Sequence, residues 1–311
     1  MQKLFTGLQP SGALHIGNYL GVLKPFADMY GKYTSFLMVA DYHALTTLKD
    51  PARMRQNILD AVKDYLAVGV DPKKATIFQQ SQIPEHTELT WILNTLVTMS
   101  FLELAHAFKD KEARGLETNV SLFDYPVLMA SDIVLYDTDV VPVGQDQKQH
   151  IEYARDIAGK FNTAYGETFT LPTEKIIEGV AIVPGTDGKK MSKSYGNTIP
   201  LFGTKDEIAK AVMSIVTDSK GTSPEHVYNI HRLFRGGEAL AKLYKENTGK
   251  YKALKEALVE DIEAVVSPMR ERRESIPDAD VKTILKEGSE KAREQAERKM
   301  IEVRRKVGVS L

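Results

Sequence analysis

The sequence predicts an α/β protein: a doubly wound domain with a parallel sheet and an inserted segment, followed by an α-helical domain. Strand-like and helix-like patterns alternate through the first 200 residues, as they do where crossover helices join parallel strands. After about residue 200 the strand patterns end and amphipathic helical patterns follow. We therefore predict domains at 1–200 and 201–311, with a last helix that can pack back on the first domain.

The first predicted elements form a strand–helix–strand unit. The segment 3–8 is short, apolar and followed by turn residues, and the segment 34–43 contains an uninterrupted apolar run at 36–40. Such a run is typical of a strand that is buried on both faces. Between the two strands, apolar residues recur at helical spacing: Tyr19, Leu20, Leu23, Phe26 and Tyr30. The unit predicts two parallel neighbouring strands.

The next helix begins with Asp50 as its cap and Pro51 at its first position, and it ends before Gly69. Further strands are predicted at 75–81 and 139–144. The second of these precedes a helix that directs five apolar residues inward: Ile151, Ala154, Ile157, Ala158 and Phe161.

The second domain is predicted to contain only helices. The amphipathic segments are 206–218, 238–247, 251–266 and 280–308. Pro268 and Pro277 are predicted to separate the last two of them. No internal repeat was found.

Length and composition restrict the class of protein. A chain of 311 residues and 34.7 kDa can bury a sizeable core, and 42% hydrophobic with 27% charged residues is ordinary globular composition. No run approaches the ~18 apolar residues of a membrane span. The N-terminus, MQKLFTGLQPSG, lacks the apolar core of a secretory signal. We expect a soluble, cytoplasmic protein without a membrane partner.

Cysteine is absent, which excludes disulfides, thiolate zinc sites and iron–sulfur clusters. Any protein-held metal would need oxygen or histidine ligands. The formal net charge of −1 gives no indication of a nucleic-acid partner, although a neutral total can hide a local basic face.

The segment LQPSGALHIGNYLG, 8–21, lies where the first strand should pass into the first helix. In α/β proteins this is a phosphate-binding position, because glycines let the backbone approach and the helix N-terminus presents free N–H groups. The segment matches neither GxGxxG nor GxxxxGK[ST], so the standard dinucleotide and Walker motifs are excluded. The alternatives are an unfamiliar nucleotide-binding, Rossmann-like loop or a simple turn with a satisfied histidine.

A second motif, GKKMSKSYGN at 188–197, lies where the α/β pattern ends. The chance of one specified five-residue string in ~300 positions is on the order of one in ten thousand, so Lys190–Ser194 is a specific match. The alternative is a solvated basic loop between domains. Gly185, Gly188 and Gly196 are hinge candidates if this loop moves.

The two motifs, His15–Asn18 and Lys190–Ser194, resemble the signature motifs of the class I aminoacyl-tRNA synthetases. The segments 10–21, 124–136, 141–150 and 216–219 extend this resemblance over essentially the whole chain, toward the bacterial tryptophan-specific branch. The resemblance implies activation of L-tryptophan by ATP to tryptophanyl-adenylate and pyrophosphate, then transfer to the 3′-terminal ribose of tRNA(Trp). A carboxylate is already a nucleophile, so positioning and neutralisation of phosphate charge should supply most of the catalysis.

The resemblance also implies which residues bind ATP. Asn18 replaces the histidine of the commoner motif and can still donate a hydrogen bond. Lys109 is a further candidate phosphate contact. Mg²⁺ should arrive with ATP and need no dedicated protein site. The implied catalytic residues are His15, Asn18, Lys190, Lys193, Ser194 and Lys111, and the implied ATP-binding residues are Gln9, Ser11, Gly17, Asn18, Gly144, Asp146, Met191 and Lys193.

Tyr125, Met129 and Asp132 are spaced i, i+4 and i+7, which places them on one helical face. An apolar wall with one acceptor suits an indole, whose only polar atom is its N–H. The resemblance assigns that contact to Asp132; the alternative for Tyr125 and Met129 is a simple core role. The full implied tryptophan site is Phe5, Gly7, His43, Tyr125, Met129, Asp132, Val143 and Gln147.

The resemblance further implies a homodimer and a helical domain that contacts the tRNA anticodon. Basic clusters at 270–273 and 304–306 have acidic neighbours, so neither identifies anticodon-reading residues. Two alternatives remain: a tyrosyl-tRNA synthetase, which shares the architecture, and a synthetase-like protein that no longer aminoacylates. The presence of both ATP-binding motifs argues against the second.

Overall fold

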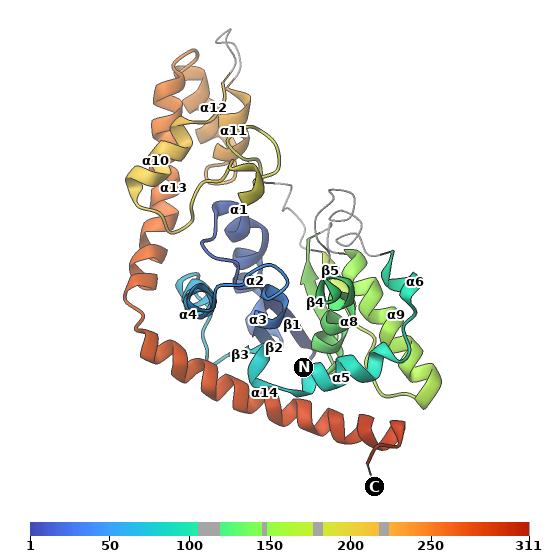
Figure 1. Ribbon diagram of the computed structural model, residues 1–311. Coiled ribbons are helices and arrows are strands. Elements are labelled where there is room, and N and C mark those ends of the chain that lie inside the picture. The colour runs from blue at the N-terminus through green and yellow to red at the C-terminus, as the bar shows by residue number, and fades with distance from the viewer. Residues whose placement is uncertain (105–118, 145–147, 177–182, 218–223, 311) are drawn as a thin grey trace.

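The computed structural model describes residues 1–104, 119–144, 148–176, 183–217 and 224–310. Its centre is a five-stranded sheet, and every neighbouring pair of strands is parallel. The spatial order β3-β2-β1-β4-β5 reverses direction between β1 and β4, which confirms the predicted doubly wound class (Figure 1). The strands are β1 (Lys3–Leu8), β2 (Thr34–Val39), β3 (Ala75–Gln79), β4 (Val140–Val143) and β5 (Thr173–Ile176).

The four predicted strands are present, whereas β5 was not predicted. β2 is buried from Ser35 to Val39, as its uninterrupted apolar run requires. β5 has the sequence TEKI, is only partly buried, and pairs with β4 alone at the edge of the sheet. An edge strand with two charged residues has no apolar run or alternation to reveal it.

The two faces of the sheet bury different side chains. Leu4, Leu37 and Ile77 belong to one core, and Phe5 and Phe78 belong to the other. This alternation follows from the two-residue period of a strand. On the second face, the ring of Tyr136 stacks on Phe5 and on Phe36, with a centroid distance of 4.8 Å to Phe36, and the ring of Phe78 lies tilted against it.

Helical segments connect the strands on both faces. Between β1 and β2 the chain forms α1 (Ile16–Asn18), a π-helical turn η1 (Tyr19–Leu23), α2 (Lys24–Met29) and η2 (Tyr30–Lys32). Between β2 and β3 it forms α3 (Asp41–Ala44) and α4 (Pro51–Ala67). The carboxylate of Asp50 accepts hydrogen bonds from the backbone N–H groups of Ala52 and Arg53, which confirms the predicted cap.

The connection from β3 to β4 includes η3 (Gln80–Gln82), α5 (Glu85–Asn94), α6 (Met99–Leu102) and α8 (Val120–Val134). α9 (Lys148–Tyr165) joins β4 to β5, and its predicted inward residues are buried. α8 packs between α5 and α9, so it lies against the aromatic face of the sheet.

Beyond β5, every regular element of the described residues is helical, as predicted. These elements are η5 (Lys193–Tyr195), α10 (Lys205–Met213), α11 (Glu225–His231), α12 (Gly237–Glu246), α13 (Tyr251–Glu274) and α14 (Asp278–Val307). The predicted break at Pro268 is wrong, because α13 continues through it to Glu274. Proline removes one helical hydrogen bond, but Val266 and Met269 on either side stay buried. Packing of this face therefore preserves the helix.

The basic cluster at the end of α13 is used inside the molecule. Arg270 pairs with Glu263 at 2.7 Å, and Arg272 donates to the carbonyl of Ala67 at 2.9 Å. Arg273 reaches Asp64 on α4 at 2.6 Å. The contacts of Arg272 and Arg273 join α13 to α4, whereas the pair of Arg270 with Glu263 lies within α13 itself.

α14 runs along the open edge of β3 (Figure 1). The hydroxyl of Ser289 accepts a hydrogen bond from the backbone N–H of Gln79 at 3.3 Å. The neighbouring Gly288 lies so close to the strand that a Cβ there would be 1.8 Å from the carbonyl oxygen of Ile77. Only glycine permits this approach.

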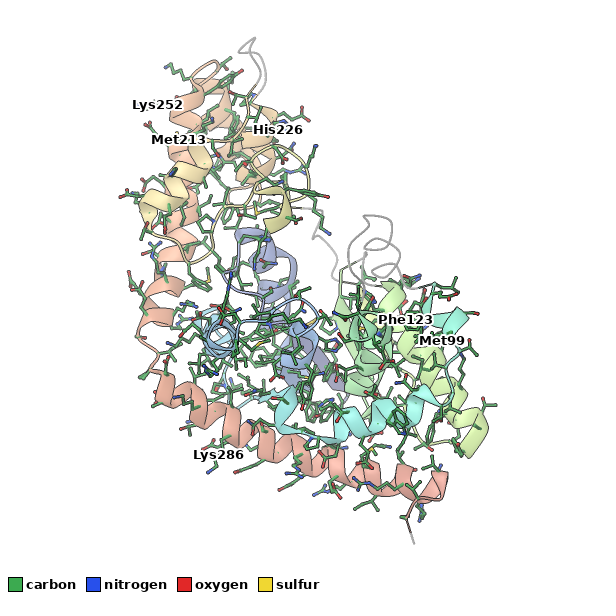
Figure 2. The ribbon with its side chains drawn as sticks, in the orientation of Figure 1. Met99, Phe123, Met213, His226, Lys252 and Lys286 are labelled. Atoms are coloured by element: carbon green, nitrogen blue, oxygen red, sulfur yellow. The ribbon has the colours of Figure 1, made fainter. Side chains whose placement is uncertain are left out.

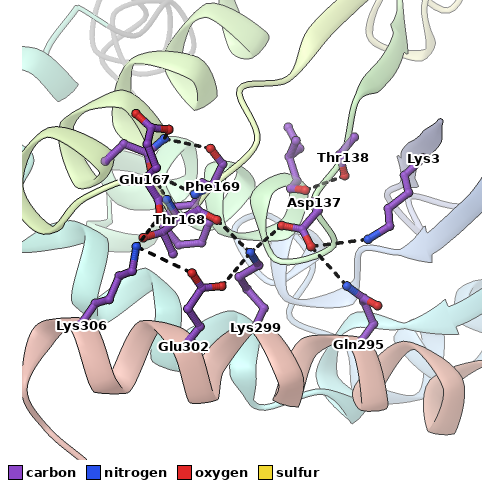
Figure 3. Close-up of polar contacts among 12 residues, drawn as sticks. Lys3, Asp137, Thr138, Glu167, Thr168, Phe169, Gln295, Lys299, Glu302 and Lys306 are labelled. Carbon is purple, nitrogen blue, oxygen red and sulfur yellow. Dashed lines mark hydrogen bonds and ion pairs between the residues drawn. The ribbon is translucent and has the colours of Figure 1, made fainter.

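The second half of α14 is held by polar contacts (Figure 3). Lys299 lies 2.6 Å from a carboxylate oxygen of Asp137 and donates to the carbonyl of Thr168 at 2.8 Å. Lys306 donates to the carbonyl of Glu167. The helix therefore links the loop before β4 with the loop before β5.

We predict that Gly288→Ala lowers the free energy of unfolding by about 2–3 kcal/mol, because the new methyl group would displace α14 from the strand. Gly159→Ala is the matched control. Gly159 also lies inside a helix, but no atom lies within 4 Å of its Cβ position, so alanine should stabilise the protein by about 0.5–1 kcal/mol. Urea denaturation measures both, and equal effects would contradict the close contact.

Candidate active site

Backbone hydrogen bonds bring together the two motifs that the sequence separates. The N–H of Ile16 donates to the carbonyl of Ile199 at 3.0 Å, and the N–H of Leu201 donates to the carbonyl of Leu14 at 3.0 Å. The segment after Lys190–Ser194 thus lies antiparallel to the segment that enters α1. The two motifs form one wall of the same site.

The side chain of Lys193 completes this junction. Its Nζ donates to the carbonyl oxygens of Ser11 at 3.3 Å and Gly12 at 3.2 Å, in the turn after β1. Burial is the main cause that lowers the pKa of Lys193. The nearby charge of Asp64 acts in the opposite direction and raises that pKa. The direct partners of the ammonium are neutral carbonyls, so an incoming phosphate would find a cation already in place.

His15 begins α1 and is buried. Its backbone N–H donates to Oδ1 of Asn18 at 3.0 Å, which leaves the amide nitrogen of Asn18 to donate elsewhere. Nδ1 of the His15 ring has no hydrogen-bond partner among the described residues. At Gly17, a Cβ would lie 2.9 Å from this Nδ1. Gly17 therefore provides the space in which the ring lies.

Burial, and then the charge of Lys193, lower the pKa of His15 to about 4. The ring is neutral at pH 7 and can donate one N–H to a phosphate oxygen without acting as an acid. This state agrees with a site that neutralises charge chiefly with lysine and amide groups.

The remaining residues of the second motif differ in exposure. Lys190 and Ser194 are exposed, and the Ser194 hydroxyl lies 2.9 Å from that of Ser192. Met191 is buried in the core, and its N–H is bonded to the carbonyl of Val183 at 2.9 Å. The side chain of Met191 thus holds the loop against the protein.

A cavity of about 450 Å³ lies at the carboxyl ends of β1, β2 and β4, against α8. That is the edge where open parallel sheets bind ligands. Nine residues predicted for the tryptophan or ATP site line it: Phe5, Gly7, Gln9, His43, Tyr125, Met129, Asp132, Val143 and Gly144. Four other predicted residues lie outside the described ranges: Lys109, Lys111, Asp146 and Gln147.

Asp132 is the buried charge of this cavity, with 1% of its surface exposed. Nε2 of His43 lies 2.7 Å from its Oδ2, and Nε2 of Gln80 donates to Oδ1 at 2.8 Å. Nδ1 of His86 lies 2.7 Å from Oδ1, away from the line of a straight hydrogen bond. Three side chains therefore orient one carboxylate.

Burial alone would raise the pKa of Asp132. The polar contacts with His43 and His86, together with their charge, outweigh burial and lower that pKa to about 2. Asp132 is therefore an ionised acceptor throughout the physiological pH range.

Gln80 and His86 are site residues that the sequence reasoning missed. Gln80 follows β3 directly, and His86 is completely buried, with its Nε2 2.8 Å from the Tyr136 hydroxyl. The available signal was the polar run QQSQ at the carboxyl end of a predicted parallel strand.

The face of α8 that lines the cavity confirms the predicted helical spacing of Tyr125, Met129 and Asp132. The hydroxyl of Tyr125 is buried and has no hydrogen-bond partner in the described part of the chain. Its ring meets that of His150 edge to face, with centroids 5.9 Å apart. An unpaired buried hydroxyl beside a cavity indicates a place for a polar ligand group.

The described residues offer neither a metal site nor a membrane-spanning helix. They contain no group of three or more histidine, aspartate or glutamate side chains placed to hold a metal ion. No helix among them is long and apolar enough to cross a membrane.

Comparison with known proteins agrees with this geometry. Residues 1–275 match the family described as tRNA synthetases class I (W and Y). The chain belongs to this family. It is 46% identical to a tryptophan–tRNA ligase of Rhodopirellula baltica over 99% of both chains, and 48% identical to one of Fusobacterium nucleatum over 99% and 98%. The resemblance predicted from the motifs is confirmed.

Solved structures give the same result. The chain is similar to a tryptophanyl-tRNA synthetase from Campylobacter jejuni complexed with ADP and tryptophan, with a TM-score of 0.91, 43% identity and coverage of 99% and 100%. A tyrosyl-tRNA synthetase from Archaeoglobus fulgidus, at 19% identity and a TM-score of 0.67, covers 88% of this chain and 90% of its own. That likeness shows only the shared architecture.

We predict that the His15 ring titrates near pH 4 in the ligand-free protein, as measured by NMR of its Cε1 proton. The unfolded chain binds this proton near pH 6.5, so His15 favours unfolding increasingly as the pH falls below that value. Lys193→Ala should raise the pKa of His15 by removing a nearby positive charge. A wild-type midpoint near 6.5 would contradict the buried, neutral ring.

Proposed function

We propose that this chain is a tryptophan–tRNA ligase that acts in two steps. A carboxylate oxygen of L-tryptophan attacks the α-phosphorus of ATP, and pyrophosphate leaves with the electrons of the broken P–O bond. A hydroxyl of the tRNA(Trp) 3′-terminal ribose then attacks the adenylate carbonyl, and AMP leaves. The observation that supports this most directly is the junction of two cation- and amide-bearing motifs beside an apolar cavity with one ionised carboxylate.

The residues of the two motifs bind the triphosphate in this proposal. His15 and Asn18 donate hydrogen bonds, and Lys190, Lys193 and Ser194 hold the pyrophosphate as negative charge develops on it. Lys111 is proposed to add a further cation. Mg²⁺ enters on the ATP phosphates, which suits a site that offers cationic and amide donors.

The ATP base and ribose are proposed to lie along the loops after β1 and β4. Gln9, Ser11, Gly17, Gly144, Asp146 and Met191 are the proposed contacts. Gln9 lines the cavity and donates to the carbonyl of His43 at 2.9 Å, so its position links the ATP site to the tryptophan site.

The tryptophan side chain is proposed to fill the cavity beside α8. Phe5, Met129 and Val143 pack on the indole, and its N–H donates to Asp132, which His43 helps to orient. Phenylalanine would leave Asp132 without that donor, and a site built around such a bond discriminates strongly. Gly7, Tyr125 and Gln147 are proposed to meet the amino-acid backbone groups.

We assign residues 1–200 to the catalytic domain and 201–311 to a helical domain that contacts tRNA, with α14 returning to the first. The reaction is placed in the cytoplasm because its product serves translation. Because Arg270, Arg272 and Arg273 are engaged within the protein, other surfaces of α10–α13 should meet the tRNA.

Amino-acid-dependent exchange of labelled pyrophosphate into ATP tests the function. Run separately with each of the twenty amino acids, it should proceed with tryptophan alone. Exchange with tyrosine would reassign the substrate while preserving the mechanism. If no amino acid supports exchange, the result favours the alternative, a synthetase-like protein that no longer aminoacylates.

We predict that Asp132→Asn raises the KM for tryptophan at least tenfold, because a hydrogen bond to a charged group contributes about 1.5–3 kcal/mol. The KM for ATP should change little. Asp124→Asn is the matched control: Asp124 also lies on α8, but it accepts from Asn94 and does not line the cavity. Equal increases in both KM values would show that Asp132 supports the fold instead.

We also propose that the chain forms a homodimer through α5, α6 and the start of α8. These elements expose large apolar side chains: Trp91 is 74% exposed, Met99 67% and Val120 82%. Figure 2 shows Met99 and Phe123 on this side of the molecule, far from His226. Several large apolar side chains exposed on neighbouring elements are typical of a protein interface.

We predict that Trp91→Glu converts the dimer into a monomer of 34.7 kDa, as measured by light scattering. A buried charge without a partner disfavours the interface strongly. Ile301→Glu, at a 59% exposed position on α14, is the control and should leave the mass unchanged. A wild-type monomer would refute the proposed dimer.

A further inference from the structure

The loop that contains the second motif has a defined internal structure. The N–H of Gly185 donates to the carbonyl of Lys189 at 2.7 Å, and the N–H of Met191 donates to the carbonyl of Val183 at 2.9 Å. Pro184 and Lys190 face each other as an antiparallel bridge. The segment 183–191 is therefore a small hairpin, and the motif begins on its returning arm.

Asn197 closes this hairpin from beyond the motif. It is 3% exposed. Its Oδ1 accepts from the backbone N–H of Ser192 at 2.8 Å, and its Nδ2 donates to Oδ1 of Asp187 at 2.7 Å and to the carbonyl of Lys190 at 3.1 Å. Its own carbonyl accepts from the N–H of Thr186 at 3.0 Å. One residue thus bonds the tip, the returning arm and the motif.

The identity of residue 185 supports this arrangement. A Cβ at Gly185 would lie 2.4 Å from the amide carbon and the amide nitrogen of Asn197. The amide of Asn197 thus occupies the space that a side chain at residue 185 would need, which explains the glycine at this position. Only a group that both accepts and donates satisfies all three side-chain contacts, and asparagine does so without charge.

We propose that Asn197 is a positioning residue for tryptophan activation: its amide holds Lys190–Ser194 in the shape from which Lys193 reaches the Ser11–Gly12 turn. Asn197 contacts neither of these carbonyls, so it acts through the backbone of Ser192 and Lys190. This inference rests on the proposed function, because the consequence for catalysis follows only if Lys193 meets the pyrophosphate.

Other contacts hold the outer side of the hairpin. The N–H of Val216, after α10, donates to the carbonyl of Thr186 at 2.8 Å. The ring of His226 on α11 lies against Gly188, where a Cβ would be 2.2 Å from its Cε1. These contacts do not involve the Asn197 amide, so a substitution there should alter the shape of the motif without unfolding the helical part.

Asn197→Asp tests the proposal. The new carboxylate keeps the acceptor for Ser192 but loses both donors and lies beside the carboxylate of Asp187. We expect kcat/KM for ATP in tryptophan-dependent pyrophosphate exchange to fall at least tenfold, while the KM for tryptophan stays within twofold. Asn247→Asp is the control: the Asn247 amide donates to the carbonyl of Leu243 at the end of α12, and both constants should stay within twofold of wild type.

The exchanged pair Asp187→Asn with Asn197→Asp distinguishes positioning from loss of structure. In this double variant the amide is at residue 187 and the carboxylate at residue 197, so the hydrogen bond between the two residues can form again. We expect at least a fivefold recovery of kcat/KM for ATP relative to Asn197→Asp alone. No recovery, or an unchanged kcat/KM for ATP in the single variant, would overturn the proposal.

Limited proteolysis with trypsin gives a readout that does not depend on activity. Cleavage after Lys190 and Lys193 in the ligand-free protein should be faster in Asn197→Asp than in wild type, and slower again in the exchanged pair. Unchanged cleavage would overturn the positioning role. Faster cleavage in a protein whose wild type lacks pyrophosphate exchange would confirm the role of Asn197 in shaping the loop and refute only the proposed function.

Discussion

The antiparallel contact between segments 14–16 and 199–201 is the constraint on which the active site depends. It consists of two backbone hydrogen bonds, yet it joins residues that lie more than 180 positions apart. This contact brings the helix start at His15 and the cation at Lys193 to one place, as the proposed binding of one triphosphate requires. A lysine on a long exposed loop would lose much conformational entropy on binding, and anchoring the loop beforehand reduces that cost.

The cavity beside α8 depends on the balance between the unfavourable burial of the Asp132 carboxylate and the hydrogen bonds that it accepts. A carboxylate as deeply buried as Asp132 is unfavourable unless it is surrounded by donors. His43 and Gln80 supply them from the ends of β2 and β3, so the two strands that are neighbours in the sheet also determine where the acceptor points. The orientation of the Asp132 carboxylate thus follows from the parallel arrangement of the strands.

Most of the fold could be predicted because its signals are local. The apolar run of β2 and the cap at Asp50 each specify an element without reference to the rest of the chain. β5 could not be predicted, because an edge strand with charged residues shows no apolar periodicity. The path of α13 through Pro268 depends on burial by other helices, which no local pattern reports.

The candidate site also contains residues that could be predicted from the sequence and residues that could not. The two motifs and the face of α8 could be recognised from residue types and spacing. The roles of His86 and Asn197 could not, because each depends on atoms that are distant in sequence: the carboxylate of Asp132 for one, and the backbone on both arms of a hairpin for the other. At these two positions the sequence carries no signal beyond the residue type itself.

The position of α14 has a consequence for how the chain folds during synthesis. β3 is the outer strand of the sheet, and its free edge is covered by residues 288–289 of the last helix. Until those residues leave the ribosome, the nascent sheet exposes unpaired N–H and C=O groups that could pair with another chain. Folding of α14 onto β3 therefore removes this edge from pairing with another chain, and the edge is covered only after residues 288–289 have been synthesised.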